Sequence, residues 1–470
     1  MTAHLWTLFL YSTLLLLLGA ALARRVKRAG DFFVASRRLG TGLLFSTLLA
    51  ANIGAGSTVG AAGLGYESGL VAWWWVGSAA VGSALLAFTV GPRLWRIAAT
   101  HGFLTVGDYL EHRYDRRVRG AVAILLWLGA LVILAGQFIA IAWILNVVAQ
   151  APKWLGCLVG GIVVTAYFSA GGLIGVAWVN LVQVAVKLAG FLLAVPFALS
   201  YAGGWESVVL SLQQNQVPLD NYLSFTSGGF SRVFDYLILL APSFLVSPGI
   251  LQKVYGAREA TVARNGVLLN AVCLFLFAML PPLLGITARS LHPHLENREL
   301  ALPTVMVEML PPWLGSLALA AVFSAELSSA DAVLAMLSTS FAKDFVKGHL
   351  RSDLTDSQLL RLARWVALFA GLLGIGLAVL LPSVLSALQI FYGLLTVALF
   401  VPLVFGLYWR APNATSALTA IGAGVTATVS FQLLREGKGI GILSPVACGI
   451  AMAAAVMSFL TLWKRDVQPL

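Results

Sequence analysis

Charged residues are scarce in this sequence. Of its 470 residues, 10% are Asp, Glu, Lys or Arg and 59% are hydrophobic, and the mean hydropathy is +0.90. Soluble domains contain about 45–50% apolar residues, so this composition excludes a soluble protein. Only helices and closed barrels satisfy their backbone hydrogen bonds in lipid, and the apolar runs are too long for barrel strands. The sequence therefore predicts an all-helical, multi-pass membrane protein.

Cysteine and histidine are also sparse. Cys157, Cys273 and Cys448 each lie alone in an apolar segment, so the sequence has neither a disulfide framework nor a metal-binding spacing. The six histidines lie at or outside the ends of the apolar runs, and no paired carboxylates accompany them. We therefore expect neither an enzyme nor a cofactor. The net charge of +11 lies in short basic clusters between apolar runs, which the positive-inside rule explains without a nucleic-acid partner.

The apolar runs predict thirteen transmembrane helices of about 20 residues each. The first is followed by Arg24, Arg25, Lys27 and Arg28, which places the N-terminus outside; an odd number of spans places the C-terminus in the cytoplasm. We expect the plasma membrane, which in a bacterium is the inner membrane. The spans cover residues 5–23, 42–65, 70–94, 118–148, 155–169, 173–201, 234–254, 266–286, 313–341, 362–381, 383–409, 415–434 and 443–463.

Two of these spans carry signs of a break. Residues 50–65 contain five glycines, and Ser247-Pro248-Gly249 interrupts the seventh span. Broken helices in corresponding places of two halves indicate a transporter's binding site, although small residues also serve close packing. The breaks open two sets of five spans. We therefore expect one transporter domain, 1–470, made of a first helix and basic loop (1–38), repeat one (42–201), repeat two (234–409) and two C-terminal helices (415–463).

Two acids lie within the ninth apolar span. Glu326 and Asp331 stand among several serines, in the stretch FSAELSSADAVLAMLSTS. A carboxylate in hydrocarbon needs a partner, a cation or a proton. Oxygen-rich clusters suit small hard cations, so we interpret this helix as part of an ion site.

Five stretches of the chain resemble the sodium:solute symporter family, which includes proline, pantothenate, sialic acid and sodium/glucose transporters. They are DFFVASRRLG, AANI, YFSAGGLIGVAWVNLVQ, SPGILQKVYGA and SAELSSAD. The resemblance implies the leucine-transporter fold, with an inverted repeat of five plus five helices. It also implies sodium-coupled symport of a small organic solute by alternating access.

The resemblance also implies a sodium site between the second and ninth spans. Its ligands would be the backbone carbonyls of Ala50, Ile53 and Ala325 and the hydroxyls of Ser328 and Ser329. An unwound segment frees carbonyl oxygens that a regular helix would use, which agrees with this assignment.

A second cation site of the family departs from its usual pattern here. Asn180 stands where some members have an aspartate, and Asp331 lies one helical turn after Ser328. We hypothesise a variant cation or proton site made of Asn180, Asp331 and Ser328. Lys187 leaves three interpretations open: a structural partner of Glu326 or Asp331, a proton-carrying substitute for sodium, or a contact to an anionic solute. We interpret Glu326 as structural.

We expect the solute between the two broken helices. Phe391 and Tyr392 are candidate gate aromatics, and Trp73 to Trp75 are interpreted as anchors at the membrane interface. The chain lacks the acidic and amide residues that sugar transporters of the family place after AANI, which argues against a sugar. The candidate solute residues are Asn52, Gly54, Gly56, Ser57, Gln137, Ser243, Ser247, Gly249, Gln389 and Tyr392.

Two alternatives to sodium symport remain from the sequence. One is a proton-coupled symporter that uses Lys187 and Asp331. The other belongs to a different class, a transporter-like membrane sensor, against which stands the short segment after Trp463. The partners expected in either case are a small solute, sodium or protons, and the lipid bilayer.

Overall fold

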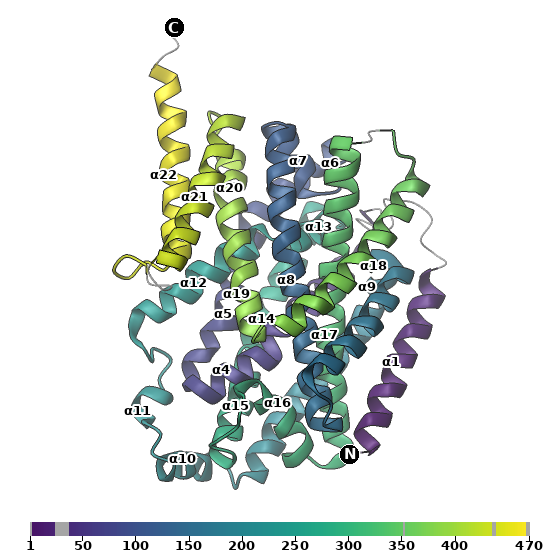
Figure 1. Ribbon diagram of the computed structural model, residues 1–470, viewed down its shortest axis with the longest axis vertical. Coiled ribbons are helices and arrows are strands. Elements are labelled where there is room, and N and C mark those ends of the chain that lie inside the picture. Colours follow the sequence, from purple (N-terminus) through teal and green to yellow (C-terminus); the bar gives the residue numbers. More distant parts are fainter. Residues whose placement is uncertain (1, 24–36, 351–352, 435–438, 467–470) are drawn as a thin grey trace.

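The computed structural model describes residues 2–23, 37–350, 353–434 and 439–466, which form a nearly all-helical bundle (Figure 1). The basic loop expected after the first span lies outside these residues. Helix α1 (Thr2–Ala23) begins at the lower end of the view, and α22 (Pro445–Asp466) ends at the upper end. The two ends of the chain therefore lie on opposite sides of the bundle.

The first predicted break is confirmed. Helix α3 (Thr41–Asn52) stops where Ile53 takes an extended conformation, with φ −93° and ψ 96°. The chain resumes as η2 (Gly56–Gly60) and α4 (Ala61–Ser68). A cluster of glycines weakens the helix at this point, because glycine gains least from helical order.

The second predicted break is confirmed as well. Helix α12 (Gly229–Val246) ends at Ser247, whose ψ of 120° is not helical, and α13 (Pro248–Tyr255) begins at the next residue. Proline has no N–H to donate, which costs nothing in the first turn of a new helix. Each expected set of five spans thus opens with a broken helix.

The remaining helices depart from the expected list in two ways. Helical structure runs unbroken through α9 (Lys153–Tyr201), where we predicted separate spans at 155–169 and 173–201; the intervening Ala-Gly-Gly contains no proline to remove a backbone donor. The segment between the spans predicted at 173–201 and 234–254 contains the helices α10 (Trp205–Gln214) and α11 (Leu219–Tyr222). Among the described residues, ten helices are long and apolar enough to cross a membrane, so the count of thirteen is not confirmed.

The other elements complete the bundle. They are η3 (Gly69–Ala72), α5 (Trp73–Phe88), α6 (Val90–His101), α7 (Val106–Arg113), α8 (Arg116–Ala149), α14 (Ala260–Phe277), α15 (Leu280–Leu291), η4 (Arg298–Leu300), α16 (Ala301–Thr304), η5 (Val305–Met309), α17 (Pro312–Thr339), η6 (Ser340–Leu350), α18 (Asp356–Leu380), α19 (Val384–Leu395), η7 (Thr396–Phe400), α20 (Val401–Tyr408) and α21 (Ala414–Leu434).

Helix α17, which carries the two acids, lies at the centre of the bundle. It packs against α9, α8, α3 and α18, and nearly all of its residues are buried. Small residues such as Ala321 and Ala325 allow this close approach of neighbouring helices. Glu326 and Asp331 are 0% and 1% exposed, so their environment is set by other helices rather than by lipid or water.

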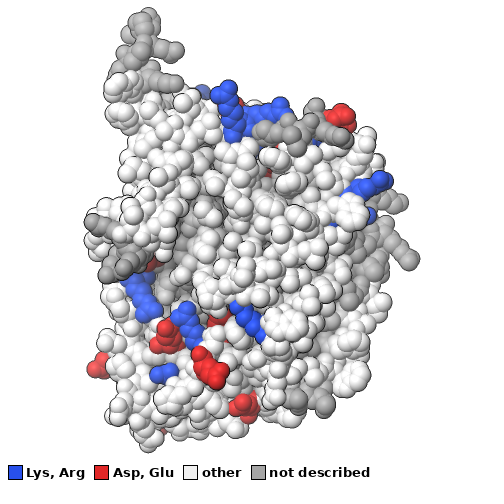
Figure 2. Space-filling model, viewed as in Figure 1, with Lys and Arg blue, Asp and Glu red and all other residues white. Residues whose placement is uncertain are grey.

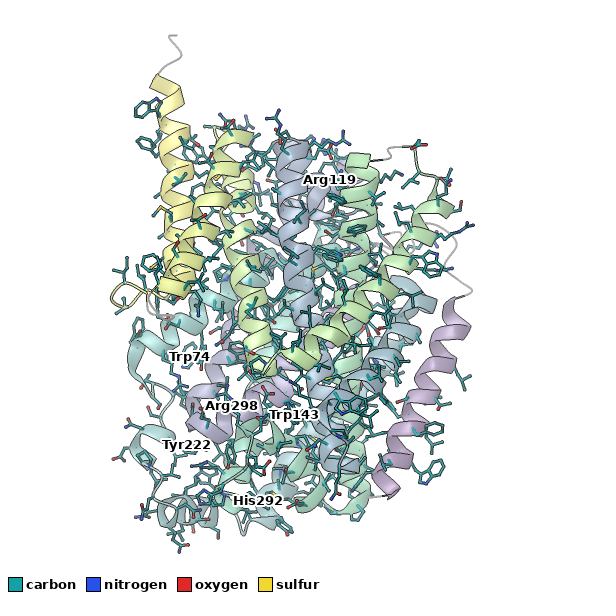
Figure 3. The ribbon with its side chains drawn as sticks, viewed as in Figure 1. Trp74, Arg119, Trp143, Tyr222, His292 and Arg298 are labelled. Carbon is teal, nitrogen blue, oxygen red and sulfur yellow. The ribbon has the colours of Figure 1, made fainter. Side chains whose placement is uncertain are left out.

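Charge is distributed unevenly over the surface (Figure 2). Lys and Arg gather at the upper end, both signs occur in the lower part, and a broad zone without charge lies between. Large apolar side chains, including Trp313, Phe369 and Leu380, are exposed on the bundle. Such a surface suits contact with lipid tails, and Figure 3 places Arg119 near the upper end and His292 near the lower end.

Candidate cation and solute site

A buried ammonium group occupies the gap left by the first broken helix. Lys187, on α9, is 0% exposed. Its Nζ donates to the carbonyl oxygen of Ala50 at 2.7 Å, to that of Ile53 at 3.0 Å and to Ser328 Oγ at 2.5 Å. The break makes this possible because the N–H of Gly54, which would bond Ala50 in a regular helix, donates instead to Ser57 Oγ. Lys187 therefore lies among three of the expected sodium ligands.

The two serines expected as sodium ligands face the same break. Ser328 Oγ lies 2.7 Å from the carbonyl oxygen of Ala50 and 3.1 Å from that of Ala325. Ser329 Oγ lies 2.9 Å from the carbonyl oxygen of Ala51. The structure thus brings the expected ligands together around one point, with Ala51 as an additional carbonyl that the sequence did not indicate.

Lys187 makes no ion pair with Glu326 or Asp331 in the described part of the chain. Glu326 Oε1 instead accepts a hydrogen bond of 2.8 Å from Thr58 Oγ1 on η2. The charges of both acids, and that of Lys253, act on Lys187 without direct contact. Glu326 thus ties α17 to the segment that follows the break.

Asn180 and Asp331, expected with Ser328 or Lys187 at a second cation site, are not hydrogen-bonded to each other or to those two residues in the described part of the chain. Both carboxylate oxygens of Asp331 and the Oδ1 atom of Asn180 are buried and have no hydrogen-bond partner among the described residues. Ser328 and Lys187 bond each other at the first site instead. Asp331 is thus a buried acid whose oxygens have no direct partner, and an unsatisfied carboxylate in a membrane interior is costly.

A cavity lies between the two broken helices. Ser243 and Gln389 do not line it. Ser243 Oγ bonds the Leu239 and Tyr392 carbonyls, and Gln389 is exposed, because about 100° of helical rotation separates it from the cavity-facing Leu388. The expected residues that do line the cavity are Asn52, Gly54, Gly56, Ser57, Gln137, Ser247, Gly249 and Tyr392.

Aromatic side chains form one wall of the cavity. Trp75 is only 3% exposed and donates from Nε1 to the Gly56 carbonyl at 2.9 Å, so its interpretation as an interfacial anchor was wrong. Its ring lies 6.4 Å from that of Tyr392, which lies 5.8 Å from Phe244. The run of three tryptophans suggested a belt, but the side chain of Trp75 on α5 faces the cavity.

Lys253, on α13, is a cavity residue that our sequence analysis missed. It is 3% exposed and is the only charged residue among the described residues that line the cavity. A signal was available: Lys253 follows Gly249 by four residues, so both lie on one helix face. That spacing, read from the break at Pro248, places an ammonium group beside the expected solute site.

Ionic contacts close the bundle at its Arg119 end. Arg119 pairs with Asp344 at 2.8 Å and also with Glu111, and Lys343 pairs with Asp108; these residues join α7, α8 and η6. Burial acts to raise the pKa of Asp108, but attraction to Lys343, the Leu104 N–H and Arg119 outweigh it, so the pKa lies below its ordinary value. We call the five charged side chains of Asp108, Glu111, Arg119, Lys343 and Asp344 the Arg119 cluster.

Toward the other end, Glu299 links three elements. It is buried on η4 and accepts hydrogen bonds from Trp143 Nε1 at 2.9 Å and from the Val384 N–H at 2.8 Å. Burial raises the pKa of Glu299 despite these donors. The carboxylate therefore holds the start of α19, the helix that carries Tyr392, against α8.

The helical bundle with its two broken helices has the leucine-transporter fold, as its similarity to solved structures shows. A solved structure of a Na⁺-coupled sialic acid symporter, in a substrate-bound outward-open state, has a TM-score of 0.82 at 20% identity and covers 98% of both chains. A nucleobase-cation-symport-1 family transporter bound to bromovinylhydantoin has a TM-score of 0.58 at 15% identity and covers 93% of this chain and 95% of its own.

The chain belongs to the sodium:solute symporter family, whose model matches residues 32–424. It is similar to the sodium/pantothenate symporter of Escherichia coli, with 27% identity over 86% of each chain. It is also similar to the human sodium/iodide cotransporter, with 27% identity over 88% of this chain and 67% of that one. Family and relatives are transporters, not enzymes, and they support a sodium-coupled solute transporter in a membrane.

Proposed function

We propose that this protein is a secondary active symporter for a small organic solute, and that the Lys187 ammonium takes the place of a sodium ion at its first cation site. The observation that carries this proposal is the hydrogen bonding of Lys187 Nζ to Ala50, Ile53 and Ser328. An ammonium group and a sodium ion both carry one positive charge and both satisfy convergent oxygen atoms. They therefore compete for one position, and sodium can enter only when Lys187 leaves.

The tethered cation changes which ion drives transport. When Lys187 holds the break closed, the proton on its ammonium group takes the role of the coupling ion. The charged groups facing Lys187 from other elements are Glu326 and Asp331 on α17 and Lys253 on α13. Asp331 on α17, together with Asn180 on α9, is the proposed second cation or proton site.

A second candidate keeps sodium as the coupling ion. Lys187 bonds only three of the expected sodium ligands, and Ser329 and the Ala325 carbonyl belong to the same site. If the lysine side chain turned away, all of these oxygen atoms would be available to a sodium ion. The relatives named as sodium symporters favour this candidate. In it, Lys187 is a competitor that sodium displaces in each transport cycle.

We propose that transport proceeds by alternating access, with the contacts at the two ends of the bundle opening in turn. In the proposed cycle, the Arg119 cluster closes the path on the basic side, which we assign to the cytoplasm by the positive-inside rule. It opens when the solute and the proton are both bound. We propose the plasma membrane as the location, with the N-terminus outside and the C-terminus inside.

Solute uptake into proteoliposomes tests the proposal. Uptake is measured with sodium or choline as the external cation, while the proton gradient is kept constant. We expect uptake to persist in choline and to follow the proton gradient. Strict dependence on sodium contradicts the place given to Lys187, and solute binding without any uptake favours a membrane sensor.

A further inference from the structure

Lys253 lines the cavity, and its ammonium group has no hydrogen-bond or ion-pair partner among the described residues. The side chain is only 3% exposed. The acid whose charge acts on it is Asp331, without direct contact. A buried ammonium group with no partner is costly in a membrane interior, and such a group marks a functional site.

The backbone of α13 adds to the positive character of this point. The helix begins at Pro248, and Gly249 and Ile250 in its first turn both line the cavity. The N–H groups of a first helical turn have no partner within the helix, and the helix dipole is positive there. Side chains on a helix lean toward its N-terminus, so Lys253, four residues after Gly249, reaches back along the face that exposes these groups.

The other described residues that line the cavity are uncharged. The described lining residues include no Asp, Glu or Arg, and Asn52, Ser57 and Gln137 supply neutral polar atoms. Trp75, Phe244 and the other aromatic residues supply an apolar wall. One end of the cavity is therefore positive, and the remainder suits an uncharged body of mixed polarity.

We infer that the solute is a small organic anion whose carboxylate binds Lys253 and the N-terminus of α13. This inference rests on the proposed function, since it assigns the cavity to the transported solute. A carboxylate accepts hydrogen bonds from both the ammonium and the backbone N–H groups. A sugar hydroxyl is uncharged, so the hydrogen bonds that it accepts from these donors are weaker. The site disfavours a quaternary ammonium solute, because its charge would face that of Lys253.

Paired carboxylate and carboxamide probes test the inference on the purified full-length protein. Acetate, lactate, pyruvate and benzoate are compared with their amides, with glucose and with choline, by shift of the melting temperature. We expect at least one carboxylate to stabilise the protein and its amide to bind at least about tenfold more weakly. Equal stabilisation by a carboxylate and its amide, or stabilisation by glucose or choline alone, overturns the inference.

Two substitutions separate binding from folding. We expect Lys253→Met to remove the preference for the carboxylate over its amide, while Lys253→Arg retains it; the melting temperature without probe and the elution volume report whether each variant folds. An unchanged preference in a folded Lys253→Met variant shows that the lysine serves only Asp331, and overturns the inference. Uptake of a neutral probe would preserve the proposed function, whereas absence of both binding and uptake for all probes would overturn both proposals.

Discussion

Gly54 is the residue of the first break that leaves least room for a side chain. A Cβ atom at this position would lie 2.1 Å from Ser329 Oγ, 2.5 Å from Ser329 Cβ and 2.9 Å from Gln137 Oε1. Rotation of the serine hydroxyl can relieve the first contact but not the second, because Ser329 Cβ is fixed to the backbone of α17. Overpacking of this kind costs about 1–3 kcal/mol. We therefore expect Gly54→Ala to force α3 and α17 apart.

The effect is measured as the melting temperature of the purified protein and as solute uptake in proteoliposomes. Gly54→Ala should lower both, since the displaced elements carry the contacts of Lys187. Gly42→Ala on α3 is the matched control, because a Cβ atom there meets no atom within 4 Å. If the two variants melt at the same temperature and transport equally well, the close approach of Gly54 to Ser329 is refuted.

Two further substitutions test charged groups beyond the break. Asp331→Asn removes a charge and keeps the side chain's size, so we expect uptake to change its dependence on the coupling cation and on pH; identical profiles would exclude Asp331 from a cation or proton site. Asp108→Asn weakens the Arg119 cluster. Because the pKa of Asp108 is lowered in the folded protein, its stabilising contribution is complete above the ordinary value of about 4 and is lost as the pH falls through the lowered value. The difference in melting temperature between the wild type and Asp108→Asn should be largest near pH 7 and shrink below about pH 4, and a constant difference over that range speaks against this role.

The two broken helices could be predicted because their causes are local. A run of glycines and a Ser-Pro-Gly sequence weaken a helix wherever the rest of the chain lies. The continuity of α9 could not be predicted in the same way, since Ala-Gly-Gly permits either a helix or a turn. Whether this segment forms one helix or two is therefore set by its packing against neighbouring helices rather than by its own sequence.

The cation site was predictable from motifs only in part. The resemblance named Ala50, Ile53, Ala325, Ser328 and Ser329, and the structure places them around one point. The sequence left three interpretations of Lys187, because spacing along α9 gives the direction of a side chain but not the distance to the end of α3. That distance is decided by the packing of α9, α17 and α3.

The cavity shows the same limit. Tyr392 lines it and Gln389 does not, although both are polar and lie one helical turn apart on α19. Polarity suggested both residues, whereas the orientation of α19 decides between them. Lys253 was overlooked because it stands in an amphipathic half-helix, where a lysine ordinarily faces water or a membrane surface.

One measurement decides whether the Lys187 ammonium takes the place of sodium. Uptake by the wild type and by Lys187→Ala is compared in sodium and in choline, at one fixed proton gradient. The substitution empties the position of the ammonium and leaves Ala50, Ile53 and Ser328 in place. We expect the wild type to transport equally in both cations and Lys187→Ala to transport only in sodium, which then enters the vacated site. If the wild type requires sodium and the variant is inactive in both cations, Lys187 does not take the place of sodium at this site.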